Sequence, residues 1–245
     1  MNYIYLILIG VFAGIVNTMA GGGSLLTLPM LTFLGLPSAV ANGTNRLAIL
    51  IGSITSVKSF KDRGYFEWKL AVRFGVPAVI GAMLGSKIAV NLSNAVFDKV
   101  LAIVMFLMLG IIIFQPHRKL KFFKKQNLLL GSILFFFVGI YGGVIQAGVG
   151  FLIIMSLTLV TNYKLVKINS TKMFIVLIYM VPSLIIFLIN GKVNFIYGIV
   201  LAIGNAIGAY IGSVSQIKKG EKIVKIILTG AIFIMALKLL GFINI

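Results

Sequence analysis

Residues 3–36 read YIYLILIGVFAGIVNTMAGGGSLLTLPMLTFLGL, and this stretch decides how the chain is expected to fold. An apolar run over residues 3–20 meets three successive glycines, and a second apolar run covers residues 24–36. As a helix the second run would be about 20 Å long, which is shorter than the hydrocarbon core of a bilayer, about 30 Å. The stretch therefore predicts a helix that glycine breaks, followed by a short half-helix in a re-entrant or broken hairpin.

The composition of the whole chain indicates a membrane protein. Of its 245 residues, 60% are hydrophobic and 11% are charged, and the mean hydropathy is +1.12. About a quarter of the residues of a soluble domain are charged, and disordered chains are poor in hydrophobic residues. Both classes are excluded, and the prediction is an all-α polytopic membrane protein.

The remaining apolar runs predict the other helices. Residues 151–160 form a second short run, which follows Ala147-Gly148-Val149-Gly150. The first run of the chain has no basic residues before it and no clear cleavage site, so we interpret it as a retained span rather than a signal peptide. Residues 127–146 form the apolar run that leads into the second glycine break, as residues 3–20 lead into the first. Full spans are predicted at residues 38–57, 68–89, 95–114, 166–188, 195–214 and 222–243.

The charged residues predict the topology. Lysine and arginine number 22 against 4 acidic residues, a net charge of +18. So basic a chain could bind nucleic acid, but its cations form short clusters between apolar runs, which is typical of cytoplasmic loops. The loop at residues 115–126 is predicted to be cytoplasmic, together with the clusters at 58–73, 164–167 and 218–225. Both termini would then face outward from a plasma membrane whose anionic headgroups contact these clusters.

The chain lacks the residues of most catalytic and metal sites. It has no cysteine, and its single histidine, His117, lies in the most basic loop. Disulfides, thiolate chemistry and histidine metal clusters are therefore excluded, and we expect neither a metal nor a cofactor. An intramembrane enzyme is disfavoured for the same reason, and because no pair of carboxylates lies within a predicted span.

The chain also contains an internal repeat. Ile80-Gly-Ala-Met-Leu-Gly-Ser86 recurs as Ile207-Gly-Ala-Tyr-Ile-Gly-Ser213, 127 residues later, and the two glycine runs have the same offset. Each half contains three full spans and one hairpin, an odd number of crossings. We therefore predict a first transmembrane repeat at residues 1–114, the basic loop at 115–126, and an inverted second repeat at 127–245. An old duplication without transport is the alternative.

Two cations are predicted to lie near the middle of the bilayer. Arg46 and Lys172 each lie about 13 Å, measured along a helix, from opposite faces of the membrane. A cation at that depth costs about 2.5–3.5 kcal/mol, and the four acidic residues all lie at span ends or in loops. Unpaired cations there indicate an anionic guest or a water-filled cavity. The alternative is that both side chains snorkel to the headgroups.

The glycine runs complete the predicted anion site. A helix N-terminus carries unpaired N–H groups and about half a positive charge, so it binds anions. Broken helices in inverted repeats are typical of secondary transporters with a midplane site. Neutral donors near the breaks add to the site. The predicted substrate-binding residues are Gly22, Gly23, Ser24, Thr44, Asn45, Arg46, Gln146, Gly148, Gly150, Asn169, Thr171 and Lys172, with Asn17 and Ser170 close by.

Several motifs of the chain occur together in one known family. They are residues 13–24 (AGIVNTMAGGGS), 41–46 (ANGTNR), 139–151 (GIYGGVIQAGVGF) and 169–172 (NSTK). In these motifs and their spacing, the chain resembles the sulfite exporter TauE/SafE family of bacterial membrane proteins over essentially its whole length. The resemblance implies export of small organosulfur anions such as sulfite, sulfoacetate or other sulfonates.

Two functions remain open from the sequence. The first is a secondary transporter that exports such anions by alternating access, with the small anion and the lipid bilayer as its partners. The second is a membrane structural or lipid-handling protein without anion transport. The sequence does not fix the oligomeric state, and a homodimer is compatible with it.

Overall fold

The computed structural model describes residues 3–114 and 127–218, and all secondary structure in these ranges is helical. The prediction of an all-α fold is confirmed. The basic loop, His117 and the predicted span at 222–243 lie outside the described residues. The helices are α1 (Tyr3–Met19), α2 (Ser24–Phe33), α3 (Ser38–Lys61), α4 (Trp68–Val90), α5 (Asn94–Phe114), α6 (Leu128–Val144), α7 (Val149–Val160), α8 (Leu165–Ile189) and α9 (Phe195–Lys218).

Membrane-spanning character is strongest in four of the described helices. The segments Trp68–Val90, Asn94–Ile111, Leu165–Ile189 and Phe195–Gln216 are long and apolar enough to cross a bilayer, whereas α1, α2, α6 and α7 are apolar but shorter. Helix α3 is continuous over 24 residues, but it is less apolar because it carries several polar side chains around Arg46. Most of these polar side chains are buried. Polar residues inside and apolar residues outside are the distribution expected in lipid.

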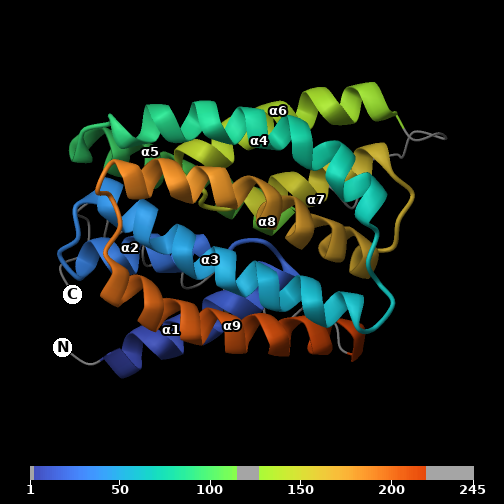
Figure 1. The fold of residues 1–245 in the computed structure, drawn as a ribbon, viewed down its shortest axis with the longest axis horizontal. Coiled ribbons are helices and arrows are strands. Elements are labelled where there is room, and N and C mark those ends of the chain that lie inside the picture. Colours follow the sequence, from blue (N-terminus) through green and yellow to red (C-terminus); the bar gives the residue numbers. More distant parts are fainter. Residues whose placement is uncertain (1–2, 115–126, 219–245) are drawn as a thin grey trace.

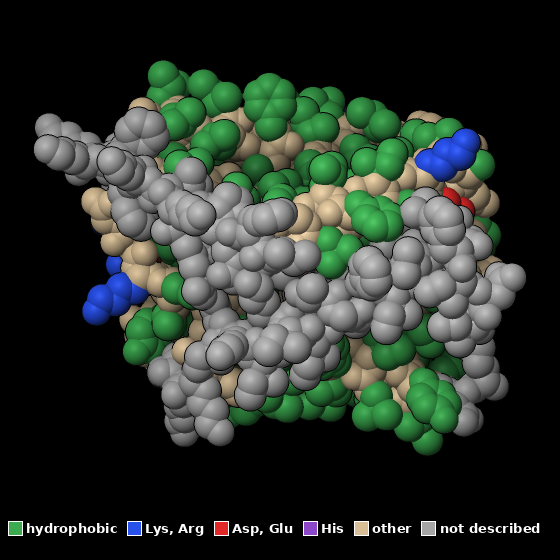
Figure 2. Space-filling model, turned by 180° about the vertical axis from the view of Figure 1, so that it is seen from behind, with side chains coloured by type: hydrophobic (Ala, Val, Ile, Leu, Met, Phe, Trp, Pro, Cys, Tyr) green, Lys and Arg blue, Asp and Glu red, His purple; other side chains and the backbone are tan. Residues whose placement is uncertain are grey.

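The outer surface is accordingly apolar. Leu129 is 75% exposed and Ile189 is 80% exposed. On the face shown in Figure 2, the described hydrophobic side chains lie along the upper and lower edges, and the visible lysine, arginine, aspartate and glutamate side chains lie near the left and right ends. This distribution matches a molecule whose long axis crosses the bilayer.

The two halves of the chain contribute matching helices. Helices α3 and α8 begin 127 residues apart, and so do α4 and α9. In Figure 1, α3 and α8 lie side by side near the middle and run in opposite directions along the long axis. Helix α1 packs on α9, and α6 packs on α4. The broken helix of each half therefore packs on the fourth helix of the other half.

Glycine makes these two helix pairs close. A Cβ at Gly81 or Gly85 of α4 would fall against backbone carbonyls of α6, and one at Gly208 of α9 would fall against the carbonyl of Val11 in α1. Small residues let membrane helices approach closely. These glycines of the repeated motif therefore serve helix packing.

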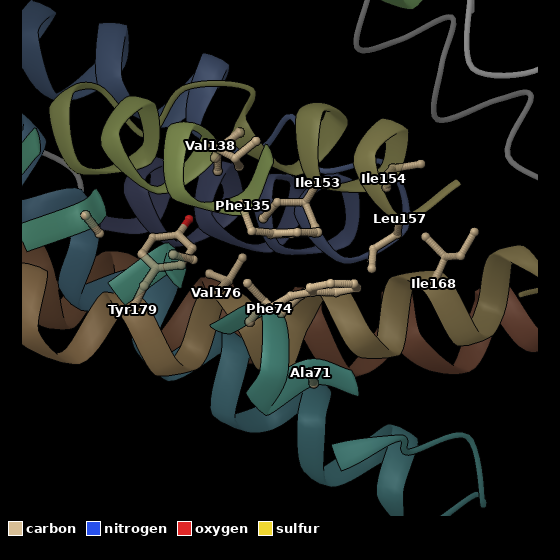
Figure 3. Packing of buried hydrophobic residues seen from close by; sticks show 14 of the residues in the cluster. Ala71, Phe74, Phe135, Val138, Ile153, Ile154, Leu157, Ile168, Val176 and Tyr179 are labelled. Atoms are coloured by element: carbon tan, nitrogen blue, oxygen red, sulfur yellow. The ribbon is translucent and has the colours of Figure 1, made fainter. Parts of the chain in front are cut away.

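An apolar cluster fills the space between α4, α6, α7 and α8 (Figure 3). The rings of Phe74 and Phe135 stack with centroids 4.9 Å apart, and Ile153 and Leu157 of α7 are fully buried beside them. The short helix α7 is thus packed against helices of both halves, which fixes the position of the break that precedes it.

One ion pair connects the segments that carry two of the basic clusters. Lys167 Nζ, near the start of α8, lies 2.5 Å from Oε2 of Glu67, which directly precedes α4. The clusters at residues 58–73 and 164–167 therefore lie at the same end of the molecule, as their charge had predicted.

Candidate functional site

Each half contains a helix break at which the chain turns through glycine. Helix α1 ends at Met19 and α2 begins at Ser24, while α6 ends at Val144 and α7 begins at Val149. Gly21 has φ +91° and Gly148 has φ +70°, so both adopt the left-handed backbone that glycine favours. These two residues are 127 positions apart, so the two breaks have a left-handed glycine at equivalent positions.

Arg46 lies at the second break. Its side chain is fully buried, and its Nη1 donates to Gly142 O at 3.2 Å and to Ser183 Oγ at 2.6 Å. Its Nη2 donates to Gly143 O at 2.6 Å, and its guanidinium lies 4.4 Å from the centre of the Phe187 ring. Gly142 and Gly143 belong to the last turn of α6, where unpaired carbonyls carry partial negative charge.

Lys172 lies at the first break. Its Nζ donates to Asn17 O at 2.8 Å and to Thr18 O at 2.9 Å, both in the last turn of α1, and only 1% of the residue is exposed. The prediction that Arg46 and Lys172 lack partners inside the protein is therefore wrong, because backbone carbonyls at helix ends serve where no carboxylate is present. Snorkelling to the headgroups is also wrong, since both side chains are buried.

An asparagine accompanies each cation. Asn42 Nδ2 donates to Val144 O at 2.8 Å, and Asn169 Nδ2 donates to Met19 O at 2.9 Å. Asn42 and Asn169 are 127 residues apart, and each holds the last carbonyl of the broken helix in the other half. The sequence reasoning chose Asn169 and missed Asn42, although the repeat offset could have identified it.

The two glycine runs meet each other. A Cβ at Gly21 would fall against the backbone of Gly150, and a Cβ at Gly150 would fall against the backbone of Gly21. The sequence predicted these glycine runs to form part of an anion site. In this structure the close approach at these two positions is between the halves of the chain.

The other glycines of the predicted site lie near the same breaks. Gly23 packs against the carbonyl of Ala13, Gly148 packs against Met108, and Ser24 is buried at the start of α2. Gly22 lies in the same turn, and its carbonyl accepts from the backbone N–H of Leu25.

Two amide side chains extend the polar surroundings of the breaks. Asn45 Oδ1 accepts from Thr27 Oγ1 of α2 at 2.6 Å. Gln146 Oε1 accepts from the hydroxyl of Tyr179 at 3.0 Å. Gln146 has φ +60°, an uncommon value for a residue other than glycine. Strained backbone of this kind occurs where the surrounding structure fixes a functional geometry.

Two predicted residues serve elsewhere in this structure. Thr44 Oγ1 accepts from the backbone N–H of Asn194, in the turn between α8 and α9. Thr171 Oγ1 donates to Lys167 O within its own helix. Both are buried, but these hydrogen bonds do not join them to either helix break.

Seven buried polar atoms lack a partner among the described residues, and two of them belong to Gln216, near the end of α9. They include Asn45 Nδ2 and Arg46 Nε, and the hydroxyls of Ser53 and Ser170, which can donate; Asn169 Oδ1 is an acceptor. A buried donor without a partner costs about 1–3 kcal/mol. A guest that accepts hydrogen bonds would remove that cost. In the described ranges no group of three or more His, Cys, Asp or Glu residues could hold a metal ion.

The all-helical fold, the buried cations and the broken helices are those of a polytopic membrane transporter. Comparison with known proteins supports the same class. The sequence model described as "Sulfite exporter TauE/SafE" matches residues 6–239. The chain belongs to this family.

Its relatives carry general names. The chain is similar to "Probable membrane transporter protein ORF9" of Sinorhizobium sp, with 26% identity over 97% of this chain and 92% of the relative. It is 25% identical to a "Probable membrane transporter protein" of Haemophilus influenzae, over 94% and 91% of the two chains. It is 26% identical to "Probable membrane transporter protein YfcA" of Escherichia coli K12, over 96% and 88%. No solved structure shows a significant match.

Proposed function

We propose that this chain exports small organosulfur anions, such as sulfite or sulfonates, across the plasma membrane by alternating access. Its two halves act as inverted repeats around a cationic site at the helix breaks, with the basic loop at residues 115–126 in the cytoplasm. The observation that carries the proposal is the exchange of contacts between the halves. Arg46 of the first half holds α6 of the second, and Lys172 of the second half holds α1 of the first.

The charge at the breaks suits an anion. The two side chains contribute two positive charges, which the C-terminal ends of α1 and α6 offset by about half a charge each, while the N-terminal ends of α2 and α7 add about as much. The described acidic residues all lie outside this region. A net charge of about +2 would replace part of the hydration that an anion loses on entering the membrane.

The same features bear on the driving force. Asp62, Glu67 and Asp98 lie at or near helix ends and cannot relay protons through the middle of the bilayer. The membrane potential contributes about 2.3 kcal/mol per charge for each 100 mV. Because the cell interior is negative, the potential drives an anion outward, which fits export.

Thermal unfolding of the purified protein tests the site. Millimolar sulfoacetate or sulfite should raise the midpoint in wild type, whereas the chloride of a bulky cation, such as choline, should not. The Asn45→Leu variant should lose most of this ligand effect, because its unpaired Nδ2 donor is removed. The Lys167→Met variant, altered in the first turn of α8, should keep the ligand effect. A midpoint that sulfonates leave unchanged, together with lipid-dependent stabilisation or lipid movement, would favour the lipid-handling alternative.

A further inference from the structure

The last three carbonyls of each broken helix are all occupied by side chains of the other half. In α1, Lys172 takes Asn17 O and Thr18 O, and Asn169 takes Met19 O. The last turn of a helix leaves such carbonyls without partners in the helix itself. Three successive acceptors in a buried helix end are therefore satisfied by one ammonium and one amide.

Helix α6 repeats this pattern with different chemistry. Arg46 takes Gly142 O and Gly143 O, and Asn42 takes Val144 O. The agreement extends to the order, because in both ends the cation takes the two inner carbonyls and the asparagine takes the last one. The two ends were therefore built as equivalent sites.

Carbonyls at the C-terminal ends of broken membrane helices are also the ligands that hold coupling cations such as Na⁺ in transporters. Here side-chain nitrogens lie where such an ion would bind. A second cation entering either end would lie within a few ångströms of a fixed positive charge, and in a partly buried site this repulsion reaches several kcal/mol.

We propose that Lys172 and Arg46 are built-in substitutes for a coupling cation, so that the carrier needs neither Na⁺ nor K⁺. The ammonium and the guanidinium neutralise the two helix ends permanently and cannot dissociate. Cycling between conformations then depends on the anion alone. The inference rests on the proposed function, and the unfolding test below separates it from transport.

The first test uses wild-type protein in vesicles. Efflux of sulfite or sulfoacetate is measured in media whose only added cation is Na⁺, K⁺ or N-methylglucamine. We expect rates within about twofold of one another, because no free cation has differential affinity for the two states. Efflux that needs Na⁺ or K⁺ would overturn the inference while leaving the proposed function intact. Absence of efflux in every medium would instead remove the proposed function.

The second test measures unfolding and is independent of transport. Lys172→Ala leaves Asn17 O and Thr18 O without the ammonium and opens the space of its side chain. Propylammonium at tens of millimolar should recover much of the lost thermal stability, and tetramethylammonium, which has no N–H groups, should not. Lys167→Ala, in the same helix but at a partly exposed position, is the matched control and should not respond.

A third variant keeps this test decisive if the alanine variant does not fold. Lys172→Arg retains a cation with several donors, whereas Lys172→Met retains the length without charge. We expect the arginine variant to unfold at the higher temperature and the methionine variant to gain stability from Na⁺ that wild type does not gain. Equal stability of the two variants, or equal responses to alkylammonium at positions 172 and 167, would contradict the inference.

Discussion

The helix end at Met19 and the helix end at Val144 have the same task and are held by different chemistry. At the first, a single ammonium contacts two carbonyls. At the second, the arginine fork contacts two carbonyls and the hydroxyl of Ser183, and lies on the ring of Phe187. Arginine presents several donors in a rigid plane, and lysine presents a compact charge. The difference implies that the second break is the more rigid of the two.

The neighbouring hydroxyls show the same contrast. Ser183 contacts both Arg46 and Ser86, with 2.5 Å between the two serine oxygens. Its repeat partner, Ser56, contacts Thr18 at 2.8 Å. Equivalent positions in the two halves thus support the cation at the second break and the helix end itself at the first. The repeat conserves the position of the contact rather than its partner.

Loss of the arginine fork should give the largest effect. Arg46→Met leaves two carbonyls and Ser183 without its donors, and we expect a loss of about 4 kcal/mol, since each buried polar group left unpaired costs about 1–3 kcal/mol. Arg46→Lys should recover less than half of it, because one ammonium cannot replace the fork. Unfolding in detergent measures both. Equal stability of Arg46→Lys and wild type would remove the distinction between the two ends.

The second largest effect is expected at the glycine breaks, where equivalent substitutions should differ in the stability that they cost. Gly21→Ala adds a Cβ against the backbone of Gly150, whereas Gly148→Ala, at the equivalent position, adds one against the flexible side chain of Met108. Both substitutions also place alanine at positive φ, which costs about 1–2 kcal/mol. With a backbone clash in addition, Gly21→Ala should lose about 3 kcal/mol or more. Equal losses in thermal or denaturant unfolding would show that the glycine contact does not constrain the halves.

Removal of the lysine should cost less than removal of the arginine. Lys172→Met leaves two carbonyls without the ammonium, and we expect a loss of about 2–3 kcal/mol. The free energies of unfolding of Lys172→Met and Arg46→Met should be measured under identical conditions and compared. A lysine variant less stable than the arginine variant would reverse our ranking of the two breaks.

The asparagines should show a smaller difference in the same direction. Asn42→Leu removes the donor to Val144 O and the acceptor for Arg46 Nη2. Asn169→Leu removes only the donor to Met19 O, since Asn169 Oδ1 has no partner among the described residues. We expect losses of about 2 and about 1 kcal/mol. Unfolding of the two single variants measures the difference, and identical losses would mean that Asn42 does not support Arg46.

The ion pair at the end of the molecule should matter least. Lys167 and Glu67 are about one-third exposed, and pairs of this kind contribute about 0–1 kcal/mol. Lys167→Ala should therefore leave the unfolding midpoint nearly unchanged, and added salt should erase what remains. A loss as large as that of Lys172→Met would show that charge alone, rather than position at a helix end, determines stability.

The sequence predicted the helices well because apolar runs and glycine breaks are local signals. The predicted segments at 68–89 and 195–214 correspond to α4 and α9. Helix α3, predicted at 38–57, continues to Lys61. Hydropathy marks the apolar part of a helix, while basic residues such as Lys58 and Lys61 are favourable in its last turn.

The site was predicted only in part. Burial of Arg46 and Lys172 followed from their place within apolar runs. Their partners did not, because a backbone carbonyl is present at every residue and becomes an acceptor only where a helix ends beside the cation. The contact of Gly21 with Gly150 was likewise beyond local reasoning, since it depends on how the halves pack.

Anion efflux from vesicles tests most directly whether the two cations act together around one shared site. Wild type, Arg46→Lys, Lys172→Met and the control Lys167→Met are compared as folded, monodisperse protein at equal density in the membrane. We predict that the control matches wild type. Both interior variants should lose about 100-fold or more, because a loss of about 2.7 kcal/mol in stabilisation of the anion is a factor of 100. Sulfonate efflux at the wild-type rate in both interior variants would contradict the account.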